Sequence, residues 1–98
     1  MDRQRVVEIL RAHESELKAA GIVHLRIYGS VARNEASNVS DVDLLAEFDK
    51  SKRLTLVKIG SLQSHLTDLL GAPVELSAEE WMRDPVRSNA LREAVLAF

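Results

Sequence analysis

The chain contains 98 residues, of which 46% are hydrophobic, 29% are charged and none is cysteine. This length allows a single domain over residues 1–98, and the composition excludes both an intrinsically disordered chain and a disulfide-stabilised fold. The formal net charge of −2 argues against binding of bulk nucleic acid through charge alone, and no apolar run approaches the ~20 residues of a membrane span. We therefore expect a cytoplasmic protein that does not act at a membrane.

The first half of the chain predicts two strands, each accompanied by a helix. Apolar residues at helical spacing indicate a first helix that ends at a glycine. Alternating residues then indicate a strand in which Val23, Leu25 and Ile27 share one face. The expected elements are a helix from about Arg3 to Ala20, a strand from Ile22 to Tyr28, a short helix after Gly29 and a strand from Asp41 to Phe48.

The second half predicts a long helix, a short strand and two further helices. A leucine-rich stripe runs from Leu54 to Leu70, and Gly71 provides its stop signal. The strand Val74 to Leu76 follows. Ser77 and Glu80 match a capping box, which predicts a short helix with Ser77 as its N-cap. The last expected helix carries Val86, Ala90, Leu91, Ala94 and Val95.

Helices and strands therefore alternate along the chain. This order predicts an α/β (α+β) fold in which a small mixed sheet of at least three strands is covered by helices. The order of the strands within the sheet cannot be derived from the pattern.

Asp41 and Asp43 stand two residues apart at the start of the second expected strand. Residues at this spacing point to the same side of a sheet, so their carboxylates are expected to lie close together. Like charges at short distance raise a carboxyl pKa unless a cation neutralises them, and hard oxygen ligands of this kind suit Mg²⁺. The simpler interpretation is that an exposed strand end carries two solvated aspartates.

Gly29 and Ser30 follow the first expected strand where a short helix should begin. Glycine has no Cβ, so its backbone allows close approach of a phosphate, which a serine hydroxyl and nearby N–H groups can bind. By itself, Gly-Ser is more often only a turn dipeptide. Arg33, one helical turn after Ser30, has a guanidinium suited to a triphosphate, although a solvated helix arginine fits the pattern nearly as well.

The combination of these two motifs is more specific than either part. Gly29-Ser30, ten intervening residues and Asp41-Val42-Asp43 reproduce the signature of the nucleotidyltransferase fold shared with DNA polymerase beta. The sequence around both motifs resembles the minimal nucleotidyltransferases. The likeness covers Tyr28-Gly29-Ser30-Val31-Ala32-Arg33, Ser40-Asp41-Val42-Asp43-Leu44-Leu45, Val74-Glu75-Leu76 and Leu91-Arg92-Glu93-Ala94-Val95.

This resemblance implies roles for two groups of residues. The carboxylates Asp41, Asp43 and Glu75 would be catalytic and would bind two Mg²⁺ ions. Gly29, Ser30 and Arg33 would bind the phosphates of a nucleoside triphosphate, with ATP as the donor substrate. Members of the family usually carry an aspartate where Glu75 stands, so the third carboxylate of this chain is one methylene longer. Leu45, on the same strand face as Asp43, is expected to help form the floor of the nucleotide pocket.

The resemblance also implies an activity and a partner. The chain would transfer AMP from ATP to a tyrosine hydroxyl of a HEPN-domain toxin and would thereby act as an antitoxin. A chain of 98 residues leaves little room for an acceptor site of its own, which fits an acceptor carried by a partner. The alternative is a catalytically weak or inactive binding module that neutralises the toxin by complex formation, which the longer Glu75 favours. Exposed sheet edges would also allow a homodimer or a hetero-oligomer.

Overall fold

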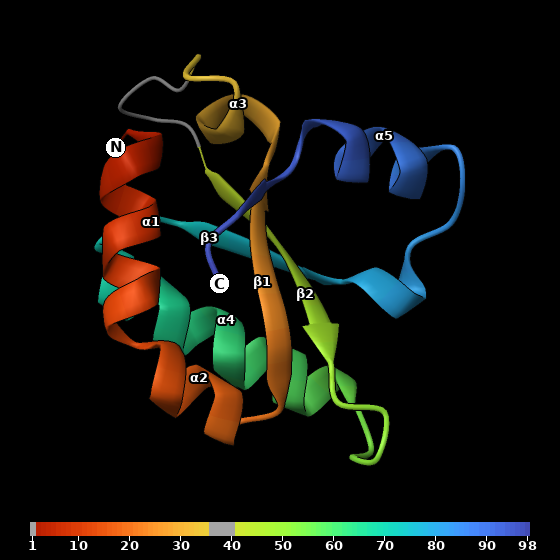
Figure 1. Cartoon of the computed structure of the whole chain (residues 1–98). Coiled ribbons are helices and arrows are strands. Elements are labelled where there is room, and N and C mark those ends of the chain that lie inside the picture. Colours follow the sequence, from red (N-terminus) through yellow and green to blue (C-terminus); the bar gives the residue numbers. More distant parts are fainter. Residues whose placement is uncertain (1, 36–40) are drawn as a thin grey trace.

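The computed structural model describes residues 2–35 and 41–98. Within these residues the expected α/β (α+β) fold is confirmed, because helices cover a small mixed sheet (Figure 1). In chain order the elements are α1 (Arg3–Ala12), α2 (Glu14–Ala19), β1 (Ile22–Tyr28), α3 (Gly29–Ala32), β2 (Val42–Phe48), α4 (Leu56–Leu70), β3 (Val74–Ala78), the 3-10 helix η1 (Glu79–Trp81), α5 (Val86–Glu93) and β4 (Val95–Leu96).

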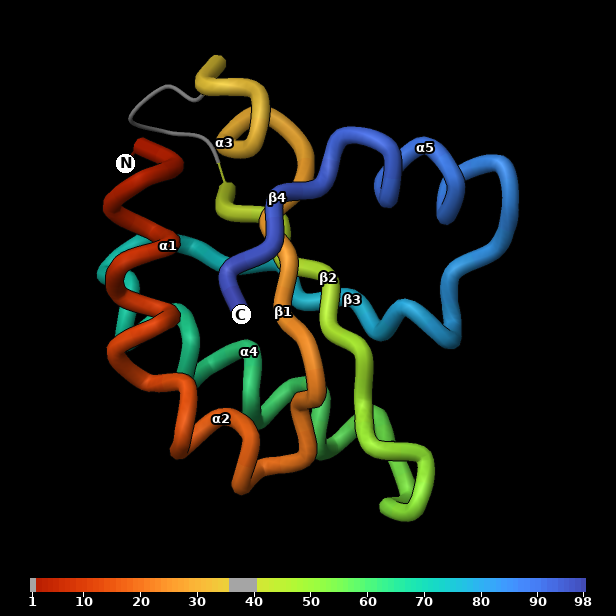
Figure 2. The backbone as a smooth tube through the Cα atoms, in the orientation of Figure 1, coloured from red at the N-terminus to blue at the C-terminus, as the bar shows by residue number. Residues whose placement is uncertain are grey.

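The sheet has the strand order β3-β2-β1-β4. β1 pairs antiparallel with both β2 and β4, whereas β2 and β3 are parallel. Two parallel neighbours need a crossover connection, and α4 supplies it between β2 and β3 (Figure 2). β1 and β2 are therefore the central strands, and residues at their ends are held from both sides.

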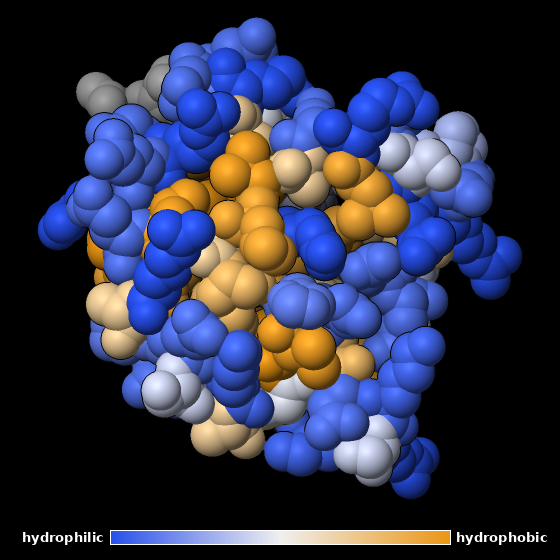
Figure 3. Space-filling model, in the orientation of Figure 1, coloured by the Kyte–Doolittle hydropathy of each residue, from blue (hydrophilic) through white to orange (hydrophobic). Residues whose placement is uncertain are grey.

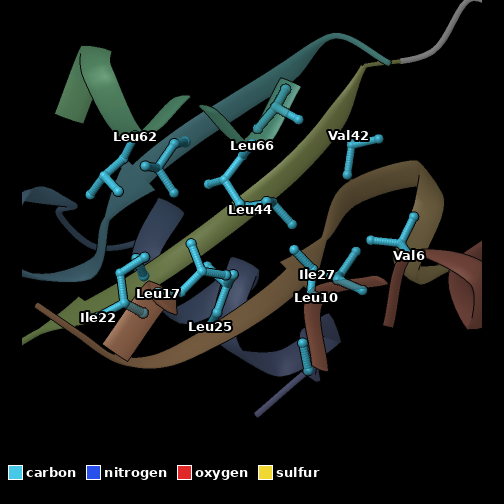
Figure 4. Packing of buried hydrophobic residues seen from close by; sticks show 14 of the residues in the cluster. Val6, Leu10, Leu17, Ile22, Leu25, Ile27, Val42, Leu44, Leu62 and Leu66 are labelled. Carbon is cyan, nitrogen blue, oxygen red and sulfur yellow. The ribbon is translucent and has the colours of Figure 1, made fainter. Parts of the chain in front are cut away.

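The core lies between one face of the sheet and the helices α1, α2 and α4. Alternate residues of β2, beginning at Val42 and continuing through Leu44 and Ala46, are at most 1% exposed. The helices contribute the side chains that Figure 4 shows pointing into the same space, namely Val6, Leu10, Leu17, Leu62 and Leu66. Each leucine buried in this way stabilises the fold by about 1.5–3 kcal/mol relative to an exposed one.

The opposite face of the sheet carries the polar residues of the same strands. α5 lies on the side of β1 away from α1 and covers only part of this face (Figure 1). Figure 3 shows apolar side chains in the middle of the surface in the same view, separated by hydrophilic ones.

Within residues 2–35 and 41–98, no helix combines the length and apolar character needed to cross a bilayer.

The N-terminal region differs from the expected single helix in two details. The helix breaks at His13, whose φ of −109° and ψ of 15° are not helical. The apolar stripe could not reveal this break, because Leu10 and Leu17 would share a face in a continuous helix as well. Val23 was expected on the buried face, but an irregularity of the β1–β2 register beside it leaves the side chain 38% exposed.

The C-terminal region differs because strand pairing overrides local helix signals. Ser77 is not an N-cap: it lies in β3 and pairs with Leu45 of β2, and η1 begins only after Ala78. The last helix ends at Glu93, so Val95 is part of β4 and pairs with Ile27 of β1. In both places a free strand edge provides backbone partners that a local sequence pattern cannot indicate.

Two leucines of α4 allow a matched test of this core. Leu66 is fully buried, whereas Leu56 in the first turn of the same helix is 78% exposed. We expect Leu66→Ala to lower the free energy of unfolding by about 3 kcal/mol, because it removes buried methyl groups and leaves a cavity. Leu56→Ala should change it by less than about 0.5 kcal/mol. Urea denaturation of both variants measures the two values, and equal losses would contradict the described packing.

Candidate active site

The strand register brings three of the polar residues into one row. Tyr28, the last residue of β1, pairs with Asp43 of β2, and Asp43 pairs in turn with Glu75 of β3. Their side chains lie on the face opposite the core, because Val42 and Leu44 on either side of Asp43 are buried. Two of the three predicted carboxylates are thus neighbours on adjacent strands. Asp41 lies directly before β2 and is exposed.

Gly29 begins the turn that follows β1 and approaches Asp43 closely. Its φ is 72°, a left-handed conformation that favours glycine, and a Cβ at this position would overlap the Asp43 carboxylate. Any other residue would therefore have to strain the backbone and displace the aspartate as well. The structure brings the predicted phosphate-binding turn and the predicted metal-binding carboxylate into contact.

The electrostatics of Asp43 reflect its crowded position. Partial burial raises the pKa of Asp43 above its ordinary value, the carboxylates of Glu75 and Asp41 raise it further, and Arg33 lowers it. The three carboxylates predicted to act together therefore influence one another across β2 and β3. A cation placed among them would relieve this repulsion.

The carboxylates of Asp41, Asp43 and Glu75 lie near one another but do not enclose a metal site. Among the residues that the structure describes, no three or more side chains of His, Asp or Glu converge closely enough to hold a metal ion by themselves. Mg²⁺ is usually held by one or two carboxylates, with water and substrate phosphates supplying the other ligands. The carboxylate oxygens of Asp41, Asp43 and Glu75 are of the type that such a mode of binding uses, in which a nucleotide would complete the coordination.

Ser30 and Arg33 belong to the short helix α3 and its end. Ser30 directly follows Gly29, and its carbonyl accepts a hydrogen bond of 2.8 Å from the Glu35 N–H. The Arg33 guanidinium donates to Glu35 at 2.9 Å and to Glu93 at 2.8 Å. In this structure Arg33 is thus held by two carboxylates, and 44% of its side chain remains exposed.

Glu93 is a residue of this site to which the sequence assigned no role. It is the last residue of α5. The carboxylate oxygen that does not bind Arg33 accepts a hydrogen bond of 3.0 Å from the Gly29 N–H. The hydrogen bond from Arg33 lowers the pKa of Glu93 below its ordinary value. Partial desolvation acts in the opposite direction, and the hydrogen bond from the Gly29 N–H lowers the pKa further. The only sequence signal was its place in the C-terminal segment that resembles the family.

Tyr28 and Leu45 complete the surroundings of Asp43. The Tyr28 hydroxyl lies 3.3 Å from the Ser77 hydroxyl of β3, so its side chain reaches across β2. Burial is the main cause that raises the pKa of Tyr28, and Asp43 and Glu75 act in the same direction. Leu45 lies on the same face of β2 as Asp43 and is fully buried, between its strand partners Arg26 and Ser77. Tyr28 and Leu45 are thus the strand neighbours of Asp43 on this face, one across the β1–β2 pairing and one along β2.

Comparisons with known proteins show which family this chain and its fold belong to. Residues 5–97 match the model of the nucleotidyltransferase domain family. The protein adenylyltransferase MntA of Thermococcus cleftensis is 33% identical over 93 residues, which are 94% of this chain and 92% of the relative. A solved structure described as a minimal nucleotidyltransferase has 36% identity and a TM-score of 0.81, covering 97% of this chain and 95% of the other.

A more distant structure shows the same fold in a complex. A chain in the structure of a tri-AMPylated Shewanella oneidensis HEPN toxin in complex with an MNT antitoxin matches with a TM-score of 0.69 and 12% identity, over 94% of this chain and 71% of the matched one. The family match over nearly the whole chain and the close relatives lead to one conclusion. This chain belongs to the minimal nucleotidyltransferases, enzymes of the nucleotidyltransferase domain family.

Proposed function

We propose that this nucleotidyltransferase transfers AMP from ATP to a tyrosine hydroxyl of a partner HEPN-domain toxin in a Mg²⁺-dependent reaction, and thereby acts as an antitoxin. The observation that carries the proposal is the contact between Gly29 and Asp43, with Glu75 next to Asp43 in the strand register. The names of the relatives support AMP as the transferred group and a toxin as the acceptor.

The donor nucleotide would bind at the turn after β1. The Ser30 hydroxyl and the N–H groups that follow Gly29 would hold phosphate oxygens, and Arg33 would add a positive charge at the other end of α3. Asp41, Asp43 and Glu75 would hold two Mg²⁺ ions together with the triphosphate. The ions would supply charge neutralisation for the departing pyrophosphate.

In the proposed transfer, the tyrosine oxygen bonds to the α-phosphorus and the bond from that phosphorus to the β-phosphate bridge breaks. Pyrophosphate leaves, and the hydroxyl proton passes to Glu75, whose exposed position lets it meet an incoming acceptor. The chain contributes mainly position and charge, since phosphoryl-type transfer needs little covalent chemistry from the protein.

The acceptor would arrive on the surface of the partner. Asp41 and Glu75 are both exposed, so another molecule can reach the carboxylate row from solvent. The helices α1, α2 and α4 pack on the other face of the sheet, whereas α5 covers only part of the face that carries the carboxylates (Figure 1). A folded toxin presenting a tyrosine from an exposed segment fits an open site better than a deep pocket would.

A second candidate function rests on the same carboxylates. Glu75 is longer than the aspartate usual in the family, and the described acidic side chains do not converge on a closed metal site. Both observations also suit a protein that neutralises its toxin by binding alone. The two functions differ in whether neutralisation needs the aspartates.

The double variant Asp41→Asn with Asp43→Asn separates these functions. With a cognate HEPN-domain toxin, ATP and Mg²⁺, we expect the unmodified chain to add the mass of an adenylyl group to the toxin. The double variant should lower the transfer rate more than about a hundredfold, because metal ligands are lost. Asp68→Asn, at an exposed position of α4, is the charge control. Mass spectrometry measures the transfer and a ribonuclease assay measures toxin activity.

Two outcomes would decide between the proposals. Loss of neutralisation together with loss of transfer supports the enzymatic antitoxin. Full neutralisation by the double variant, in a complex with an unmodified toxin, would replace it with the binding module.

The raised pKa of Asp43 predicts a pH dependence of stability. Because the folded state holds the proton more tightly than the unfolded state, the ionised carboxylate destabilises the fold as pH rises through the raised pKa. We expect Asp43→Asn to be more stable than the unmodified chain near about pH 7, and the difference to shrink as pH falls toward the ordinary value of 3.8. Thermal unfolding across this range measures it. A difference that grows at low pH would contradict the described environment of Asp43.

A further inference from the structure

Glu93 contacts both ends of the single helical turn α3. One of its oxygens accepts the N–H of Gly29, the first residue of α3, and the other accepts a hydrogen bond from Arg33, which directly follows the helix. The two contacts span 64 and 60 residues of sequence. A carboxylate from the C-terminal part of the chain therefore accepts hydrogen bonds from both ends of a turn that lies much earlier in the sequence.

A helix of this size needs such support. α3 comprises only four residues, Gly29–Ala32. One turn of helix fixes many dihedral angles for very few hydrogen bonds, so an isolated turn is unstable in water. The internal bond from the Arg33 N–H to the Gly29 carbonyl is 3.2 Å long. The charge-assisted hydrogen bonds that the Glu93 carboxylate accepts, at 3.0 and 2.8 Å, are stronger than this neutral one.

The Gly29 contact fixes a peptide plane next to Asp43. The Gly29 N–H belongs to the peptide that joins Tyr28 to Gly29, and Tyr28 is the strand partner of Asp43. By accepting this N–H, Glu93 restricts how the left-handed turn at Gly29 can rotate relative to the carboxylate that it touches. The following residue, Ser30, then leaves the turn in a defined direction.

We propose that Glu93 is a positioning residue for the nucleotide, because it clamps both ends of α3 and so sets the Gly29–Ser30 turn against Asp43. This inference rests on the proposed function, in which that turn holds the triphosphate. Glu93 itself touches neither nucleotide nor metal in this proposal. It acts through Gly29 and Arg33.

Positioning and simple electrostatics predict opposite results when Glu93 is removed. Glu93→Ala deletes a negative charge and releases Arg33, and on Coulombic grounds alone both changes should tighten the binding of an anionic nucleotide. A positioning role predicts weaker binding, because α3 loses its clamp. We expect the dissociation constant for AMP-PNP with Mg²⁺ to rise about tenfold, the loss typical of a charge-assisted hydrogen bond.

Two further variants identify the contact responsible. In Glu93→Gln, the amide oxygen can still accept the Gly29 N–H but the ion pair with Arg33 is lost, so binding should weaken by only about threefold. Glu35→Gln is the matched control, because Glu35 is the other carboxylate on Arg33 and is exposed. It should leave the dissociation constant within about twofold, or tighten it.

The experiment is calorimetric titration of Mg²⁺ and AMP-PNP into each full-length variant, at a temperature where circular dichroism shows every variant folded. Leu70→Ala, a buried substitution in α4, shows how general destabilisation affects binding. The expected order of affinity is the unmodified chain and Glu35→Gln first, then Glu93→Gln, then Glu93→Ala. Affinity in Leu70→Ala should match that of the unmodified chain.

Several results would overturn the inference. Unchanged or tighter nucleotide binding by Glu93→Ala would show that α3 does not need the Glu93 contacts. If Leu70→Ala or Glu35→Gln lost as much affinity as Glu93→Ala, the effect of Glu93 would be one of general stability or of charge, not of positioning. If the unmodified chain binds no nucleotide with Mg²⁺, the proposed function fails first. The inference about Glu93 then fails as well. That result differs from one in which the unmodified chain binds nucleotide and only the Glu93 variants contradict the expected order.

Discussion

The site depends on the close approach of the Gly29 backbone to the Asp43 carboxylate. Only a residue without Cβ leaves room for the aspartate, and only a left-handed turn at that point directs the chain from β1 into α3. This one contact joins the two halves of the sequence signature, which are separated along the chain by residues 31–40. The same contact contributes to the partial burial of Asp43, which lies beside the carboxylates of Glu75 and Asp41.

The rest of the fold holds this contact in place from both sides. β1 and β2 are the central strands, so Tyr28 and Asp43 are paired within the sheet rather than at its edge. The core beneath them is formed with helices on the other face of the sheet, and Asp41 and Glu75 on the site's side are exposed to solvent. From the remaining side, Glu93 of α5 ties the turn to the C-terminal part of the chain, although α5 contributes little to the core.

The sequence predicted the main elements because their signals are local. The leucine stripe and glycine stop of α4, the alternation in β2 and the Gly-Ser turn each depend on neighbouring residues. The strand order, the extension of β3 through Ser77 and the β4 strand depend on backbone pairing between distant segments, which no local pattern encodes. The same limit applied to the site: Asp43 and Glu75 could be named from a motif, but the role of Glu93 required the contact with Gly29.

The most direct measurement compares nucleotide binding by two glycine variants. Gly29→Ala and Gly71→Ala both place a Cβ at a left-handed residue, with φ of 72° and 65°, but only the former Cβ meets Asp43, while the latter meets nothing within 4 Å. Both should therefore carry a similar backbone strain of about 1–2 kcal/mol. The account predicts that Gly71→Ala binds AMP-PNP with Mg²⁺ as the unmodified chain does, and that Gly29→Ala loses this binding. Equal binding by the two variants would contradict it.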